Sequence, residues 1–167
     1  AKGSVVNRMA EQYLGENFWK GLRLYLKRYS YKNADTVDLW AALEEASGKP
    51  VRDIMARYTK QPGYPVVFAK GEWKSIEARE RAFKLKLEQK RFLSDGSKDK
   101  KNLLWKIPIG ISTQNFNSKE LVIDHFLMEN RTYSTVIPRY TLDQHWFKLN
   151  AGQSGFYRVA YSPELWE

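Results

Sequence analysis

The sequence contains no cysteine and only two histidines among its 167 residues. The missing cysteines exclude a disulfide framework and thiolate metal sites, and they favour a cytosolic origin. The sequence also has no apolar run long enough to cross a bilayer, and its start does not look like a signal peptide. We therefore expect a cytoplasmic protein that has no membrane partner.

The sequence is rich in core-forming residues and in positive charge. Hydrophobic residues make up 43% and aromatic residues 14%, enough for one large domain or two small ones. The net charge of +9 raises the question of a nucleic-acid partner. The basic residues are scattered, however, and cluster only at 98–101, so we expect surface solvation and no nucleic acid.

Residues 1–62 show apolar side chains at helical spacing, which predicts four short helices. The apolar stripe of the second helix consists of Phe18, Leu22, Tyr25, Leu26 and Tyr29, and we expect each helix to bury one face. The expected helices cover about Gly3–Leu14, Asn17–Tyr31, Asp35 or Thr36 to Ser47, and Pro50 to Tyr58.

Beyond Pro62–Gly63 the apolar period changes to the alternation that is typical of strands. Glu77–Ala82 could form a helical turn and is left open. The expected strands are 65–69, 83–88, 105–112, 121–126, 133–137, 146–149 and 156–161. The predicted fold class is therefore α+β, with about four short helices followed by an antiparallel β-sandwich of about seven strands.

No motif in the sequence predicts a self-contained active site. His125 and His145 do not begin a zinc-binding His-Glu-x-x-His motif, and Glu44 and Glu45 are adjacent on a helix, where neighbours do not face each other. Residues 152–155 resemble a turn more than a nucleophile elbow. Four aromatic residues in strand patterns are expected to pack in the core and not against bases: Trp105, Trp146, Phe156 and Tyr157. We predict no catalytic, cofactor-binding or metal-ligating residue.

Several short motifs occur in the order found in one region of the gluzincin aminopeptidases, and the chain resembles that family over nearly its whole length. The puromycin-sensitive branch is the most similar one, and the resemblance is weaker over residues 70–104. The motifs are Ala1–Val6, Tyr13–Glu16, Gly21–Leu22, Tyr25–Leu26, Asn33–Ala34, Asp38–Trp40, Ser47–Val51, Tyr58–Gln61, Gly63–Pro65, Lys148–Asn150 and Gly155–Val159.

The resemblance implies a zinc-dependent enzyme that removes N-terminal residues from peptides, with the zinc ligands upstream of this sequence. Lys2 and Gly3 match the end of a Tyr-x-Lys-Gly motif at the edge of that family's active site, and we expect them to start a helix. The implied domains are 1–62, the end of the catalytic domain; 63–161, a β-sandwich linker; and 162–167, the approach to a C-terminal helical domain. This segment would bind no zinc and would be inactive alone. It would support the helices of the catalytic domain that carry the zinc ligands.

Where the sequence begins and ends supports the same expectation. It has no initiator Met and no N-cap before Lys2, so we expect a piece of a longer chain whose partners are the rest of that chain and, through it, peptide substrates. Such a piece exposes apolar surface, and we expect it to self-associate. The alternative is a free-standing basic β-sandwich module that binds protein or nucleic acid.

Overall fold

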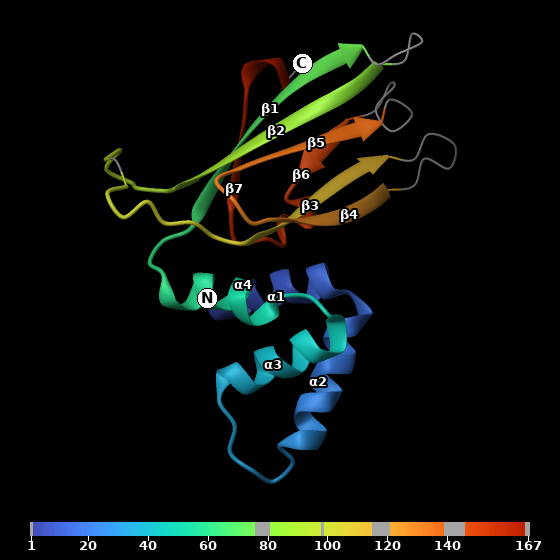
Figure 1. The fold of residues 1–167 in the computed structure, drawn as a ribbon, viewed down its shortest axis with the longest axis vertical. Coiled ribbons are helices and arrows are strands. Elements are labelled where there is room, and N and C mark those ends of the chain that lie inside the picture. The colour runs from blue at the N-terminus through green and yellow to red at the C-terminus, as the bar shows by residue number, and fades with distance from the viewer. Residues whose placement is uncertain (1, 76–80, 98, 115–120, 139–145, 166–167) are drawn as a thin grey trace. The chain divides into compact units, whose positions relative to one another are not determined.

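The computed structural model describes residues 2–75, 81–97, 99–114, 121–138 and 146–165. The chain divides into two compact units, Ala1–Pro62 and Gly63–Glu167 (Figure 1). The first is helical and the second contains the sheets, so the expected α+β fold class is confirmed. Among the helices of the described ranges, none is long and apolar enough to cross a membrane.

The helical unit contains four helices whose ends follow the capping signals of the sequence. Gly15, at φ 57°, separates the first two helices, and Gly48, in the left-handed region, ends the third. The backbone N–H of Asp35 donates to Oδ2 of Asp38 at 2.9 Å, which is half of a capping box. The helices are α1 (Lys2–Leu14), α2 (Glu16–Arg28), α3 (Thr36–Ser47) and α4 (Val51–Lys60).

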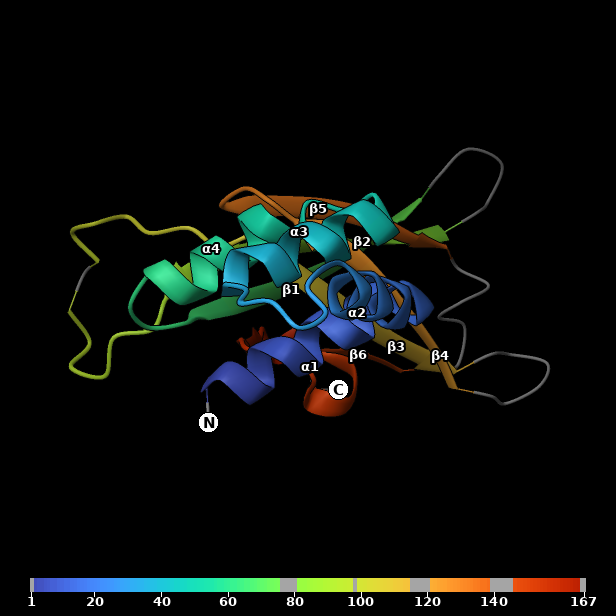
Figure 2. The same cartoon turned by 90° about the horizontal axis from the view of Figure 1, so that it is seen from below.

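Helix α2 departs from the expectation that each helix buries its apolar stripe. Its one buried residue is Gly21, whereas Leu26 of the expected stripe is 60% exposed. A Cβ on Gly21 would lie 2.8 Å from Cα of Leu43, so α2 meets α3 backbone to backbone at this point. Figure 2 shows these two helices side by side. The small contact residue brings the helices together and leaves the longer α2 side chains without full cover in the described unit.

The second unit is built from two sheets (Figure 1). One has the strand order β5-β2-β1-β7 and the other has the order β4-β3-β6. Side chains from both sheets meet, as in the contact of Phe83 with Phe147, whose ring centroids are 5.6 Å apart. The strands are β1 (Pro65–Ser75), β2 (Arg81–Arg91), β3 (Ile107–Gln114), β4 (Leu121–Met128), β5 (Thr132–Pro138), β6 (Phe147–Leu149) and β7 (Arg158–Tyr161).

Three details differ from the sequence-based expectation. Strand β7 pairs with β1 in parallel, so the four-stranded sheet is mixed. Trp146 lies outside β6 and is 52% exposed, so the expectation that it packs in the core was wrong; it precedes the strand and does not alternate with it. Of the segment left open as a helical turn, Arg81 and Ala82 begin β2 and the remaining residues lie outside the described ranges.

The two sheets are linked by buried polar groups. The Gln89 side chain, only 1% exposed, accepts from N–H of Trp105 at 2.9 Å and donates to the Trp105 carbonyl at 2.8 Å and to the Asn130 carbonyl at 2.9 Å. The hydroxyl of Tyr157 accepts from N–H of Gly110 at 3.2 Å, and burial raises the Tyr157 pKa. These bonds satisfy backbone groups of Trp105, Gly110 and Asn130.

Candidate functional site

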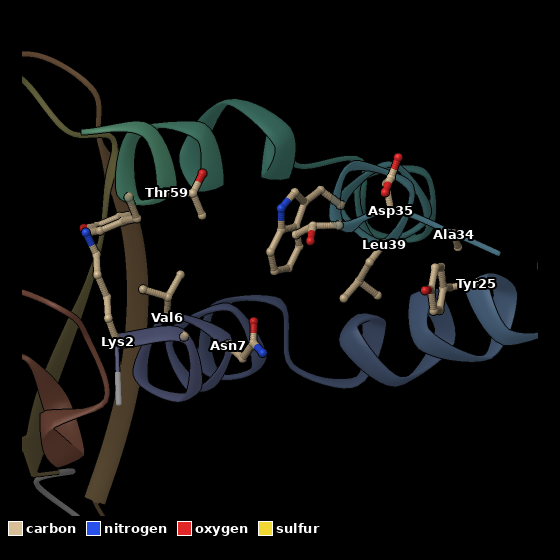
Figure 3. Close-up of a pocket in the computed structure, with 12 residues that line it drawn as sticks. Lys2, Val6, Asn7, Tyr25, Ala34, Asp35, Leu39 and Thr59 are labelled. Atoms are coloured by element: carbon tan, nitrogen blue, oxygen red, sulfur yellow. The ribbon is translucent and has the colours of Figure 1, made fainter. Parts of the chain in front are cut away.

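One hollow of the helical unit is a groove of about 550 Å³ between its four helices (Figure 3). Figure 3 shows Val6 of α1, Tyr25 of α2 and Leu39 of α3 pointing into the space between the helices. The wall is mainly apolar and aromatic, as in sites that take apolar groups. The lining residues are Lys2, Gly3, Val6, Asn7, Tyr25, Ala34, Asp35, Thr36, Leu39, Trp40, Tyr58 and Thr59.

Lys2 and Gly3 lie on the first turn of α1, as expected, and both line this groove. Nζ of Lys2 donates to the carbonyl of Gln61 at 3.4 Å, which ties the start of α1 to the end of α4. A Cβ on Gly3 would meet nothing within 4 Å, so the space beside this residue is open. The two residues that the family resemblance singled out therefore line one of the two hollows of about 550 Å³ in their unit.

A second hollow of about 550 Å³ lies between α3 and α4. Three residues belong to both hollows: Thr36, Trp40 and Thr59. The Trp40 side chain is only 7% exposed and thus forms part of the wall between the two spaces. The two hollows are therefore neighbouring spaces of the same unit.

Polar groups at the groove mouth do not form an acid–base pair. Asp35 and Asp38 act at the start of α3, where the Asp38 carboxylate accepts from the Asp35 backbone. Tyr29 has a raised pKa, because partial burial and the nearby Asp38 carboxylate both disfavour its phenolate. The groove is thus suited to holding apolar side chains and not to proton transfer.

The histidines do not create a metal centre in the described ranges. His125 lies on β4 opposite Gly110 and is half-buried, while His145 falls outside the described residues. In the part of the chain that the structure describes, no group of three or more His, Asp or Glu side chains could hold a metal ion. These residues do not fit the zinc that the family resemblance implies, and no chemical step through zinc follows from them.

Glu44 and Glu45 take part in two separate ion pairs. Oε1 of Glu44 accepts from Nε of Arg52 at 2.8 Å, and Glu45 contacts Arg28 at 2.9 Å. The hydrogen bond from Arg52 lowers the pKa of Glu44, against the opposing effect of partial burial. These carboxylates face different partners and connect helices.

The turn at residues 152–155 forms a short 3-10 helix, η2 (Ala151–Gln153). The hydroxyl of Ser154, 7% exposed, donates to the carbonyl of Ala151 at 3.0 Å. Asn150 organises the turn, because its amide accepts from N–H of Gly155 and donates to the Tyr157 carbonyl. The Ser154 hydroxyl therefore serves the turn by donating to a backbone carbonyl.

Reasoning from the sequence did not find the groove. Trp40, Leu39 and Tyr25 look like ordinary core positions, because they recur at helical spacing. The walls come from segments up to about 55 positions apart, and the spacing of apolar residues does not say which helix faces leave a gap between them. The one available signal was the family motif at Lys2–Gly3.

Comparison with known proteins supplies the class to which this architecture corresponds. Residues 1–58 match the Peptidase family M1 domain. Across nearly its whole length the chain is homologous to the M1 aminopeptidases, metallopeptidases that hydrolyse peptides, and the family resemblance drawn from its motifs is confirmed.

Individual relatives come from distant organisms. The chain is 43% identical to a puromycin-sensitive aminopeptidase of Caenorhabditis elegans over 99% of its residues, and 42% identical to aminopeptidase M1-B of Oryza sativa subsp. japonica over 98%. It is 37% identical to the human glutamyl aminopeptidase over 100%. The chain spans only 17%, 18% and 16% of these three relatives, so it corresponds to one region of each.

Proposed function

We propose that this chain is a non-catalytic segment of a zinc-dependent aminopeptidase that removes N-terminal residues from peptides. The zinc ligands and the catalytic groups belong to other parts of the parent polypeptide. Zinc, when bound there, supplies an activated water and polarises the scissile carbonyl. The chain's own residues build the support and carry no chemical step.

The observation that carries this proposal is that the sequence similarity extends over nearly the whole chain. Identity of 43% continues through both units and not only through the helices that match the peptidase domain. A free-standing binding module assembled around a sandwich would have no reason to keep the helical unit with it. The proposed domains remain 1–62 for the end of the catalytic domain, 63–161 for the linker sandwich and 162–167 for the approach to a further domain.

The helical unit is proposed to act mechanically. Its groove is lined by Val6, Leu39 and Trp40, and the Lys2–Gly3 turn lines it as well. Apolar contact with this groove would hold the zinc helices in place. We further propose that the parent works in the cytoplasm and takes peptide substrates.

The test uses the full-length parent with Leu39→Ser, which places a hydroxyl on the groove wall. We expect faster loss of zinc and a lower temperature of inactivation, with KM for an aminoacyl reporter unchanged at low temperature. Gln12→Ser is the control, because Gln12 is an exposed residue of α1 that lines neither hollow. A change in KM with zinc retention unaltered would refute a supporting role and indicate direct contact with substrate.

A further inference from the structure

Strand β5 forms an edge of the four-stranded sheet in the described part of the chain, and before its final residue, Pro138, it carries none of the usual protection of an edge. Between Thr132 and Ile137 its sequence has no charged residue and no proline, and it consists of Thr, Tyr, Ser, Val and Ile. Natural proteins commonly protect exposed edges with lysine, proline or a bulge, because a free edge accepts further strands. Val136, on the outer face, is 54% exposed.

The register shows which backbone groups of β5 face outward. N–H of Gln89 donates to the carbonyl of Arg131 at 2.8 Å, and the antiparallel pairing continues along β5 in the same register. Hydrogen-bonded and non-hydrogen-bonded pairs alternate in an antiparallel ladder. The N–H and C=O groups of Thr132, Ser134 and Val136 therefore point away from β2, toward the open edge.

A basic hollow lies on the outer face beside this edge. Its volume is about 230 Å³, and it extends from Thr132 and Ser134 on β5 across Lys86 on β2 to Lys70 and Phe68 on β1. In the register of the sheet, Ser134 lies opposite Lys86, and Lys86 lies opposite Lys70. Like charges directly opposite each other destabilise a sheet, so the pairing of Lys86 with Lys70 in this row of Ser134, Lys86 and Lys70 lowers the stability of the sheet.

The carboxylates near this row do not cancel its charge. Nζ of Lys86 contacts Glu72 at 2.9 Å, and Glu88 is paired with Lys90 at 3.2 Å. Glu164, at the end of the chain, lies within electrostatic reach of Lys70. The described outer face of β1, β2 and β7 carries five cations against two carboxylates: Lys70, Lys84, Lys86, Lys90 and Arg158 against Glu72 and Glu88. Exposed pairs such as Lys86–Glu72 are worth at most about 1 kcal/mol, so an incoming carboxylate can replace Glu72.

We propose that β5 binds an extended acidic peptide segment as an added strand. The peptide backbone pairs with the outward groups of Thr132, Ser134 and Val136, and alternate side chains fall on the outer face. Neighbouring strands are about 4.8 Å apart, so a glutamate of the added strand reaches across the small Ser134 side chain toward Lys86. The inference rests on the sheet edge alone and is independent of the aminopeptidase assignment.

The experiment measures binding of a fluorescently labelled peptide of alternating valine and glutamate to the 167-residue chain by anisotropy. We expect saturable binding that weakens as salt increases. Ser134→Pro removes one outward N–H while leaving the β2 pairing in place, and it should weaken binding about tenfold. Lys86→Gln should weaken binding to a similar extent, whereas the matched variant Lys148→Gln, on the other sheet, should not.

Two control peptides keep the result interpretable if a variant folds poorly. A peptide of alternating valine and lysine should not bind, and a valine–glutamate peptide with all of its amides N-methylated should bind at least about tenfold more weakly to the unmodified chain. Absence of binding by the valine–glutamate peptide would overturn the proposal. Equal binding of the N-methylated peptide would do so as well, since it would show attraction to the lysines without strand addition.

Discussion

Gly21 of α2 lies directly against Leu43 of α3, so closely that a Cβ on Gly21 would be 2.8 Å from the Leu43 Cα. The contact fixes where the two helices cross and leaves the rest of the α2 apolar stripe only partly covered. The contact of Gly21 with Leu43 therefore determines that part of the apolar face of α2 stays exposed in the described unit.

Gly21→Ala tests this contact. Alanine favours a helix over glycine by about 1 kcal/mol, but here its methyl group must push α3 away at a cost of about 1–3 kcal/mol. We expect a net loss of stability, measured as a lower Tm or urea midpoint. Gly3→Ala is the control, because a Cβ there meets nothing within 4 Å, and it should leave stability unchanged or raised. If both substitutions had the same effect, the close helix contact would be refuted.

Gln89→Glu tests the polar link between the sheets. The new carboxylate cannot donate to the carbonyls of Trp105 and Asn130, and it is buried beside their oxygens, so we expect a loss of about 3 kcal/mol at neutral pH. Burial raises the pKa of the new carboxyl, so the loss should shrink as pH falls and the group gains its proton. Gln12→Glu, on the exposed face of α1, is the matched control and should be nearly neutral. A pH-independent loss would point to a packing defect and not to the hydrogen bonds.

Glu44→Gln tests the ion pair with Arg52. The pKa of Glu44 in the folded protein is lower than its ordinary value of 4.5, because Arg52 donates to the carboxylate. A lowered pKa stabilises the fold above the unfolded-state value, and this stability is lost as pH falls through the folded-state value. The variant should therefore unfold at a lower temperature than the unsubstituted chain at pH 7, and the difference should disappear in acid, below the lowered pKa of Glu44. Thermal melts across this range check the prediction, and a difference that persists in acid would contradict it.

Much of this architecture could be predicted from local sequence. Strand β2 alternates as expected because its two faces meet different environments, with Leu85 and Leu87 buried and the intervening lysine exposed. The ends of α1 and α3 were predictable because Gly15 and Gly48 both have a positive φ, which glycine adopts readily and which stops a helix.

The remaining features depend on long-range packing. The parallel pairing of β7 with β1 joins segments about 90 residues apart, which no local pattern specifies. The exposure of Leu26 and Trp146 depends on what covers them, and periodicity shows only that a face is apolar. The groove was not predictable for the same reason.

Self-association follows from the open faces of the helical unit. Trp19 and Leu26 are one heptad apart on α2 and thus share a face, and they are 49% and 60% exposed. We expect the isolated chain to form dimers or larger species as concentration rises, measured by size exclusion with light scattering. Leu26→Glu should reduce association, whereas Lys27→Glu, on the neighbouring exposed position, should not. A monomer at every concentration would contradict the prediction.

The most direct measurement is the hydrolysis of aminoacyl-coumarin reporters by the full-length protein that contains this chain, with and without a chelator, beside the isolated 167 residues. Our account predicts chelator-sensitive cleavage by the full-length protein and no cleavage by the isolated chain, even when zinc is added. Cleavage by the isolated chain, or a full-length protein without chelator-sensitive activity, would contradict the assignment of this chain as a non-catalytic segment of a zinc aminopeptidase.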